Sequence, residues 1–111
     1  MVLLLLASAC SSGPRLPEGL DELETARTFF EMGRYRNAAS VAGAVQKDEE
    51  ASIYDRAEAA FLAGEAQLAQ GNDLKALKHY KYVLENAPWS EHSAAIQDRL
   101  FQIADAFFHD P

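Results

Sequence analysis

The chain has 111 residues, a formal net charge of −7 at pH 7 and a sequence pI near 4.8. This acidity argues against nucleic-acid binding, which needs a basic face, and against electrostatic adhesion to anionic lipid. The single cysteine, Cys10, excludes an intramolecular disulfide and a metal site shared between thiols.

The chain begins with a short apolar leader. Residues 2–9 carry no charge, and this run is far too short to span a bilayer, which takes roughly 20 residues in a helix. It fits the apolar region of a secretory signal, which ends in small side chains at the cleavage site. Here Ala7, Ser8 and Ala9 directly precede Cys10. We therefore expect a signal peptide over residues 1–9.

The segment Ala7-Ser8-Ala9-Cys10 resembles the lipobox of bacterial lipoproteins, in which an aliphatic residue and two small residues precede the cysteine. The resemblance implies that the Cys10 thiol is acylated and that the leader is cut before it. Each buried methylene of an acyl chain contributes about 0.8 kcal/mol, so several chains anchor a soluble domain stably. Ser11 in the next position implies, by the rule of that family, an outer-membrane lipoprotein facing the periplasm. An ordinary cleaved signal with an incidental cysteine is the alternative.

The rest of the chain is a tether followed by a helical domain. Residues 10–19 are rich in serine, glycine and proline, which predicts a lipidated tether. Residues 20–108 show no strand-like alternation and consist mostly of good helix formers. Apolar residues recur at spacings of three and four, and breakers fall at Gly33, Gly71 and Pro88. The pattern predicts five helices, at about residues 20–32, 35–47, 52–70, 73–86 and 90–108.

Part of the helical region matches the tetratricopeptide pattern, a pair of helices with small residues where they cross. The matching residues are Ala60, Ala63, Gly64, Gln67, Ala76, Tyr80 and Pro88. Gly64 and Ala76 predict a close approach of two helices, with Tyr80 filling the space between them. Gly71 is expected to form the turn, and Pro88 is expected to end the second helix.

The same unit recurs on both sides of this pair. Gly33 and Gly71 are 38 residues apart, and Gly64 and Ala104 are 40 apart, against about 34 in the standard repeat. We therefore expect an all-α solenoid of tetratricopeptide-type hairpins over residues 20–111, with about two and a half repeats. Since solenoids usually need about three repeats and a polar capping element, we expect this to be the amino-terminal part of a longer solenoid. A generic helical bundle is the alternative.

A lipobox followed by slightly long tetratricopeptide units resembles the BamD group of outer-membrane lipoproteins. The likeness is carried by "GRYRNAA" and "GNDLKALKHYKYVLENAPWSEHSAAIQDRLFQIADAFF", and it covers about residues 20–108, the amino-terminal half of a typical member. It implies a periplasmic scaffold in β-barrel protein assembly, with envelope assembly proteins or unfolded β-barrel segments as partners. The alternatives are another envelope tetratricopeptide lipoprotein (a secretin pilot or a cell-division-linked factor) and a recruiting subunit of an envelope enzyme complex.

Patterns typical of an enzyme site are missing from the sequence, which has no glycine-rich phosphate loop, nucleophile elbow or cysteine–histidine pair. His79, His92 and His109 are isolated, without the spacing that places two imidazoles on one helical face. His79 is expected to be a solvated surface residue. We therefore expect no enzymatic activity, no metal and no cofactor.

A basic stripe recurs every third residue in one predicted helix, at Lys75, Lys78 and Lys81. We expect a solvated face opposite a core face formed by Leu74, Leu77 and Leu84. A docking strip for an acidic partner is the alternative.

Candidate partner-binding residues come from the first helix of each unit, because first helices line the concave surface of such solenoids. Three rows of equivalent positions result: Leu23, Phe61 and Phe101; Arg27, Glu65 and Asp105; Phe30, Leu68 and Phe108. Two apolar rows flanking a charged one predict a groove for segments rich in aromatic side chains. Alternatively, the aromatic residues are core side chains beneath a neighbouring repeat.

Overall fold

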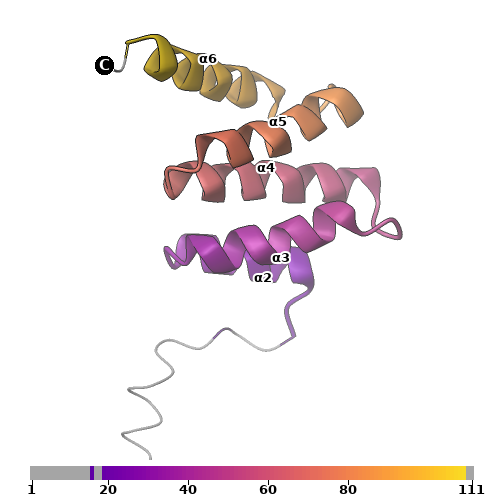
Figure 1. The fold of residues 1–111 in the computed structure, drawn as a ribbon. Coiled ribbons are helices and arrows are strands. Elements are labelled where there is room, and N and C mark those ends of the chain that lie inside the picture. Colours follow the sequence, from indigo (N-terminus) through magenta and orange to yellow (C-terminus); the bar gives the residue numbers. More distant parts are fainter. Residues whose placement is uncertain (1–15, 17–18, 110–111) are drawn as a thin grey trace, which may run out of the picture.

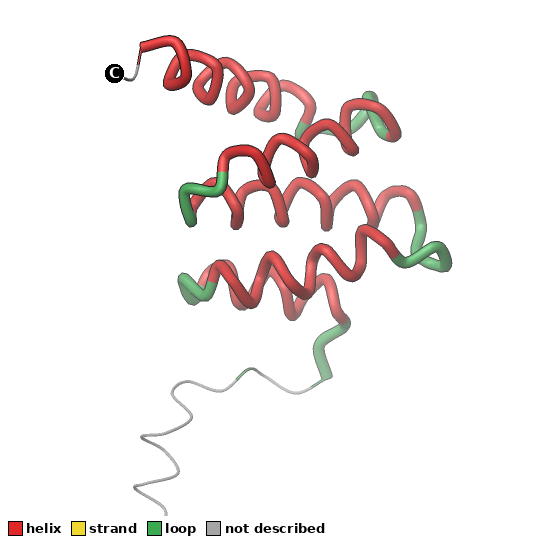
Figure 2. Tube along the Cα trace, viewed as in Figure 1, coloured by secondary structure: helices red, strands yellow, loops and turns green. Residues whose placement is uncertain are grey.

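The computed structural model describes residue 16 and residues 19–109, and all regular secondary structure in that part of the chain is helical (Figures 1 and 2). The helices are α2 (Glu22–Glu31), α3 (Tyr35–Lys47), α4 (Ile53–Ala69), α5 (Asp73–Asn86) and α6 (Ser93–His109). The predicted all-α class and the five helical segments are confirmed. The predicted signal peptide and the predicted lipidation site, Cys10, lie outside the described residues, as does most of the predicted tether.

The helices form two hairpins, α2–α3 and α4–α5. Within each hairpin, a turn of the same conformation joins the two helices. Gly33 and Gly71 have φ of +76° and +80°, a region that side chains with a Cβ rarely adopt. In each turn the glycine amide donates to the carbonyl three residues earlier, and the next amide donates to the carbonyl five residues earlier. This is the Schellman arrangement, which satisfies carbonyls at a helix end. The hairpin turn therefore repeats 38 residues along the chain, at the glycines that the sequence indicated.

The first helix of each hairpin also begins in the same way. The Asp21 side chain accepts a hydrogen bond from the Glu24 amide at 2.8 Å, and the Ser52 side chain accepts one from the Asp55 amide at 3.1 Å. Such caps satisfy amides that have no partner within the helix, and each stabilises a helix by about 1 kcal/mol. The starts of α2 and α4 are thus stabilised by hydrogen bonds between residues three apart in the sequence, which do not depend on tertiary packing.

From α3 to α6 the helices stack in chain order, with α4 between α3 and α5 and with α6 at the end of the stack, and α2 packs against α3 and α4 (Figure 1). Among the described residues, eleven of the sixteen buried apolar ones are alanines, so the backbones of neighbouring helices lie close together. None of the helices in the described part of the chain combines the length and apolar character needed to cross a membrane.

The helices α4 and α5 approach each other closely at Gly64. The Tyr80 ring is fully buried there, and a Cβ placed on Gly64 would lie 2.5 Å from Cε1 and 2.8 Å from Cδ1 of that ring. Ala76, one helical turn before Tyr80, is also fully buried. The predicted role of Gly64 and Tyr80 at a helix crossing is confirmed.

The core face of α5 differs from the prediction at one position. Leu74 is 66% exposed, whereas Ala76, Tyr80 and Val83 are fully buried. At 100° per residue, Leu74 lies on the side opposite the face centred on Tyr80. It shares that outer side with the basic stripe, whose three lysines are all exposed as expected. Leu77 and Leu84 flank the core face and are half-buried, so Leu74 alone of the three leucines was misassigned.

The contact at Gly64 generates a prediction with a matched control. Gly64→Ala should lower the free energy of unfolding by about 1–3 kcal/mol, because the new methyl group overlaps a ring that is fully buried and hydrogen-bonded through its hydroxyl. Gly43→Ala in α3 meets no atom within 4 Å and should raise stability by about 0.5–1 kcal/mol, as alanine does in helix interiors. Urea denaturation measures both, and stabilisation by Gly64→Ala would contradict the close crossing.

Candidate functional site

A cleft of about 200 Å³ opens between α2, α4 and the loop that joins α5 to α6. It is lined by Arg27, Phe30 and Glu31 of α2, Glu58, Phe61 and Leu62 of α4, and His92 of the loop. The structure thus brings together three residues from the sequence-derived rows, namely Arg27, Phe30 and Phe61. The other lining residues were not among the candidates.

The two phenylalanines of the cleft are held in place by other aromatic rings. Phe61 stacks on the His92 imidazole, with ring centroids 4.1 Å apart and planes 4° from parallel. Phe30 meets the Tyr35 ring edge-on at 5.1 Å. Both side chains are half-buried and also pack against core clusters, so each has one side in the core and another on the cleft.

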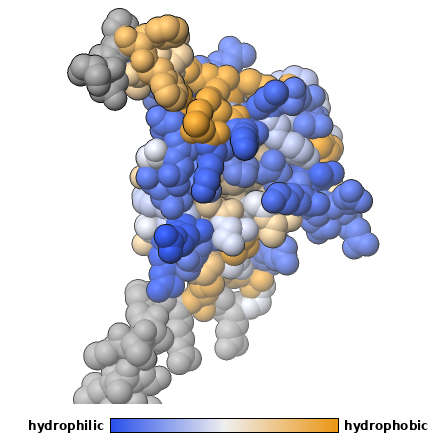
Figure 3. Space-filling view, in the orientation of Figure 1, coloured by the Kyte–Doolittle hydropathy of each residue, from blue (hydrophilic) through white to orange (hydrophobic). Residues whose placement is uncertain are grey.

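The side chains of the two apolar rows differ in solvent exposure along the stack of helices. Leu23, Phe30, Phe61 and Leu68 are half-buried and pack against the core, whereas Phe101 and Phe108 are 74% and 86% exposed on α6. Figure 3 shows this apolar surface over α6, at the top of the stack. The members of these rows on α2 and α4 therefore pack against the core, and the members on α6 are exposed on the surface.

Glu58 connects the three segments around the cleft. Its Oε2 accepts a hydrogen bond from Arg27 Nη2 of α2 at 3.2 Å, and its Oε1 accepts one from His92 Nε2 at 2.7 Å. One carboxylate on α4 thus pairs with groups from both neighbouring segments. The cleft has apolar walls and a charged rim, an arrangement suited to holding a peptide segment.

Glu65 makes a second polar cluster on α4. Its carboxylate accepts from the Tyr80 hydroxyl at 2.7 Å and from Arg99 Nε and Nη2 at 3.0 and 3.3 Å. Burial and then the Glu65 hydrogen bond raise the pKa of Tyr80, and the hydrogen bond to Glu65 raises the pKa of Arg99. The structure therefore places Glu65, a member of the charged row, in contact with α5 and α6.

The other two members of the charged row have different surroundings. Arg27 is exposed and pairs with Glu58, and Asp105 lies on the exposed side of α6. Arg27 and Glu65 thus have different partners in the structure, although the sequence alignment makes their positions equivalent.

The histidines differ from the expectation. His79 is half-buried, and its Nδ1 lies 2.7 Å from Gln46 Oε1 of α3; burial, and then the charge of Lys47, lower the pKa of this imidazole. His92 is not isolated, because Glu58 and Glu91 lie beside it. These neighbours come from a loop and from a helix 34 residues earlier, a pairing that leaves no periodic signal in the sequence. The His109 side chain lies outside the description.

Neither a protein-family model, nor a curated protein, nor a solved structure matches the chain. The interpretation of the site therefore depends on the residues and their geometry.

Proposed function

We propose that the chain is a tetratricopeptide-type solenoid that binds protein segments. The observation that carries this proposal is the cleft between the first helices of successive hairpins, α2 and α4, with Phe30 and Phe61 in its walls. Support for the repeat comes from the two hairpin turns of equal conformation and from the Gly64–Tyr80 crossing. These features match the small, aromatic and turn positions of the tetratricopeptide pattern.

The proposed ligand is an extended or helical segment rich in aromatic side chains. The half-buried phenylalanines of the cleft offer fixed apolar anchors, and Arg27 with Glu58 and Glu31 offers polar contacts at its rim. Phe101 and Phe108 extend the two apolar rows onto α6, where they are exposed. Contiguous exposed apolar surface commonly marks an interaction site on a soluble domain.

In the cell we place this module in the bacterial envelope, anchored to the outer membrane through lipid on Cys10 and facing the periplasm. The likeness to the BamD group favours a scaffold role in β-barrel protein assembly, with assembly proteins or unfolded β-barrel segments as partners. The alternatives remain a secretin pilot, a cell-division-linked factor or a recruiting subunit of an envelope enzyme complex. Tagged protein purified from membranes should carry barrel-assembly proteins if the first proposal is correct, and secretin, division proteins or an enzyme otherwise.

The apolar rows predict which substitutions weaken peptide binding. Phe61→Ala and Phe101→Ala should each lower the affinity for a peptide ending in phenylalanine by roughly thirtyfold, which corresponds to about 2 kcal/mol for an anchor side chain. Phe107→Ala is the matched control, because Phe107 is 61% exposed on α6 but lies on a different face from Phe101. Fluorescence titrations of the three variants measure the effect.

Thermal melts of the same variants separate binding from packing. A side chain that serves only the core would cost about 3–5 kcal/mol of stability when truncated, with unchanged affinity of the folded fraction. That outcome for Phe61→Ala, or equal affinity for all three variants, would contradict the proposed groove.

The lipid anchor gives a separate prediction for the cell. Cys10→Ser should release the protein from membranes into the soluble envelope fraction, because the body of the protein is acidic and has no electrostatic attraction to anionic lipid. Ser12→Ala, which keeps the cysteine, should remain in the membrane fraction. Immunoblots of fractionated cells measure how much protein is in the membrane fraction and how much in the soluble fraction. Equal membrane association of the two variants would contradict the proposed lipid anchor.

A further inference from the structure

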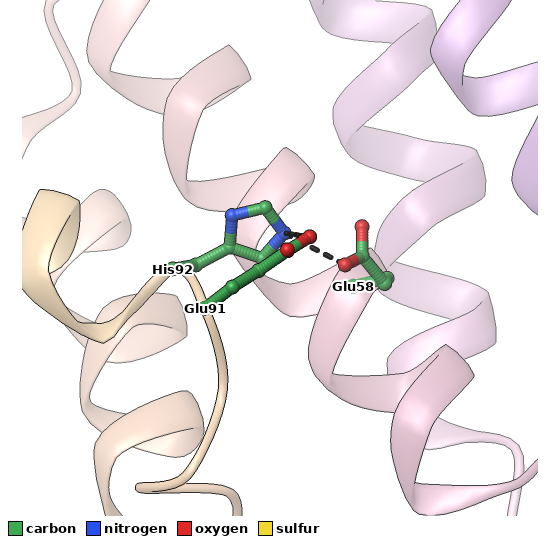
Figure 4. A group of neighbouring side chains, drawn as sticks. All are labelled: Glu58, Glu91 and His92. Atoms are coloured by element: carbon green, nitrogen blue, oxygen red, sulfur yellow. Dashed lines mark hydrogen bonds and ion pairs between the residues drawn. The ribbon is translucent and has the colours of Figure 1, made fainter.

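Three potential metal ligands converge at one edge of the cleft (Figure 4). Glu58 comes from α4, and Glu91 and His92 come from the loop between α5 and α6. His92 Nε2 and one oxygen from each carboxylate all lie within 4.8 Å of one another. Among the described residues this is the one group of three or more histidine, cysteine or acidic side chains with that spacing.

The distances within this cluster are close to those of a tetrahedral zinc site. Ligand atoms at about 2.0–2.1 Å from zinc, separated by the tetrahedral angle, are roughly 3.3–3.4 Å apart. His92 Nε2 lies 2.7 Å from the nearest Glu58 oxygen and 3.9 Å from the nearest Glu91 oxygen, so the two separations bracket the ideal one. The Glu58 and Glu91 oxygens lie within 4.8 Å of each other, and rotation of the exposed Glu91 side chain can bring its oxygen closer to the other two atoms.

Two of the three ligands are already oriented by other contacts. The His92 ring lies flat on the Phe61 ring, which fixes the direction in which Nε2 points. The second oxygen of Glu58 accepts a hydrogen bond from Arg27, which turns its first oxygen toward His92. Partners of this kind orient the ligands of known metal sites. The Glu91 side chain is 83% exposed, so it can rotate onto an ion at little cost.

We propose that Glu58, Glu91 and His92 bind a divalent transition-metal ion of the zinc type. On binding, His92 Nε2 gives up the proton that it donates to Glu58, and the neutral imidazole keeps its proton on Nδ1. One imidazole nitrogen with two carboxylate oxygens is a donor set that suits zinc, with a fourth position for water or a partner group. The two carboxylate charges, partly offset by the Arg27 guanidinium, favour a dication. The bound ion would fasten the α5–α6 loop to α4 at the edge of the peptide cleft.

Glu91 distinguishes this metal site from a simple ion pair. Its contact with His92 is long and its side chain is mostly in solvent, so the fold does not depend on it. Glu58 and His92 contact each other directly at 2.7 Å, and a purely structural pair needs no third member. Replacing Glu91 should therefore weaken metal binding without changing the stability of the metal-free protein.

The test is calorimetric titration of the tag-free protein with zinc chloride, with cobalt(II) absorption as a second readout of tetrahedral coordination. We expect one ion per chain, and a loss of affinity of about tenfold or more in Glu91→Gln and in His92→Gln, since even outer partners of metal ligands contribute 10–100-fold. Glu85→Gln on α5 and His79→Gln are the matched controls and should bind zinc like the original chain. At the same zinc concentration, zinc should also raise the Tm of the original chain by more than it raises that of Glu91→Gln.

Three results would overturn the proposal. The first is the absence of zinc binding at millimolar concentration. The second is equal affinity of Glu91→Gln and Glu85→Gln, which would mark the binding as adventitious. The third is loss of binding in His79→Gln with full binding in His92→Gln, which would place the ion at the other imidazole.

Discussion

The contact between the Tyr80 ring and the Gly64 backbone sets the distance between α4 and α5, and several other contacts follow from it. Because Tyr80 is fully buried, its hydroxyl is also removed from water. A buried hydroxyl without a hydrogen-bond partner lowers the free energy of unfolding by about 1–3 kcal/mol. Glu65 supplies the partner from the next position along α4 after Gly64. Its carboxylate is itself only 18% exposed, so its charge needs compensation, and Arg99 of α6 provides it with two hydrogen bonds. The Glu65 carboxylate thus links the crossing of α4 and α5 at Gly64 to the position of α6.

The helix α4 has a second set of contacts of the same type. Glu58, two turns before Glu65, pairs with Arg27 of α2 and with His92 of the α5–α6 loop. Phe61 lies between the two glutamates and contacts both the core and the cleft. The small residues of α4 let its neighbours approach closely, while its two glutamates fix their orientation. The proposed peptide cleft and the proposed metal site both include residues of α4, and the proposed binding surface continues onto the apolar face of α6.

The features that could be predicted from the sequence are those encoded by local or small-residue signals. Gly33 and Gly71 adopt the positive φ that their turns require, and Gly64 with Tyr80 forms the crossing expected from one glycine and one aromatic residue on facing helices. Leu74 was assigned to the wrong face because two sets of positions in α5 both have spacings of three and four, and only the contact with α4 chooses between them. The pairs Glu58–His92 and Glu65–Arg99 could not be predicted, because polar side chains 34 residues apart leave no periodic pattern. The packing of neighbouring helices determines these pairs.

The most direct test of this account is a double-mutant cycle between Tyr80→Phe and Arg99→Gln, measured by urea denaturation. Both residues bind the same Glu65 oxygen, so removing both leaves the half-buried carboxylate without either partner. If Glu65 couples α5 to α6, the effects of the two substitutions on the free energy of unfolding are not additive, with a coupling of about 0.5–3 kcal/mol. Additivity within about 0.3–0.5 kcal/mol, the range typical of independent sites, would show that Glu65 does not couple α5 to α6.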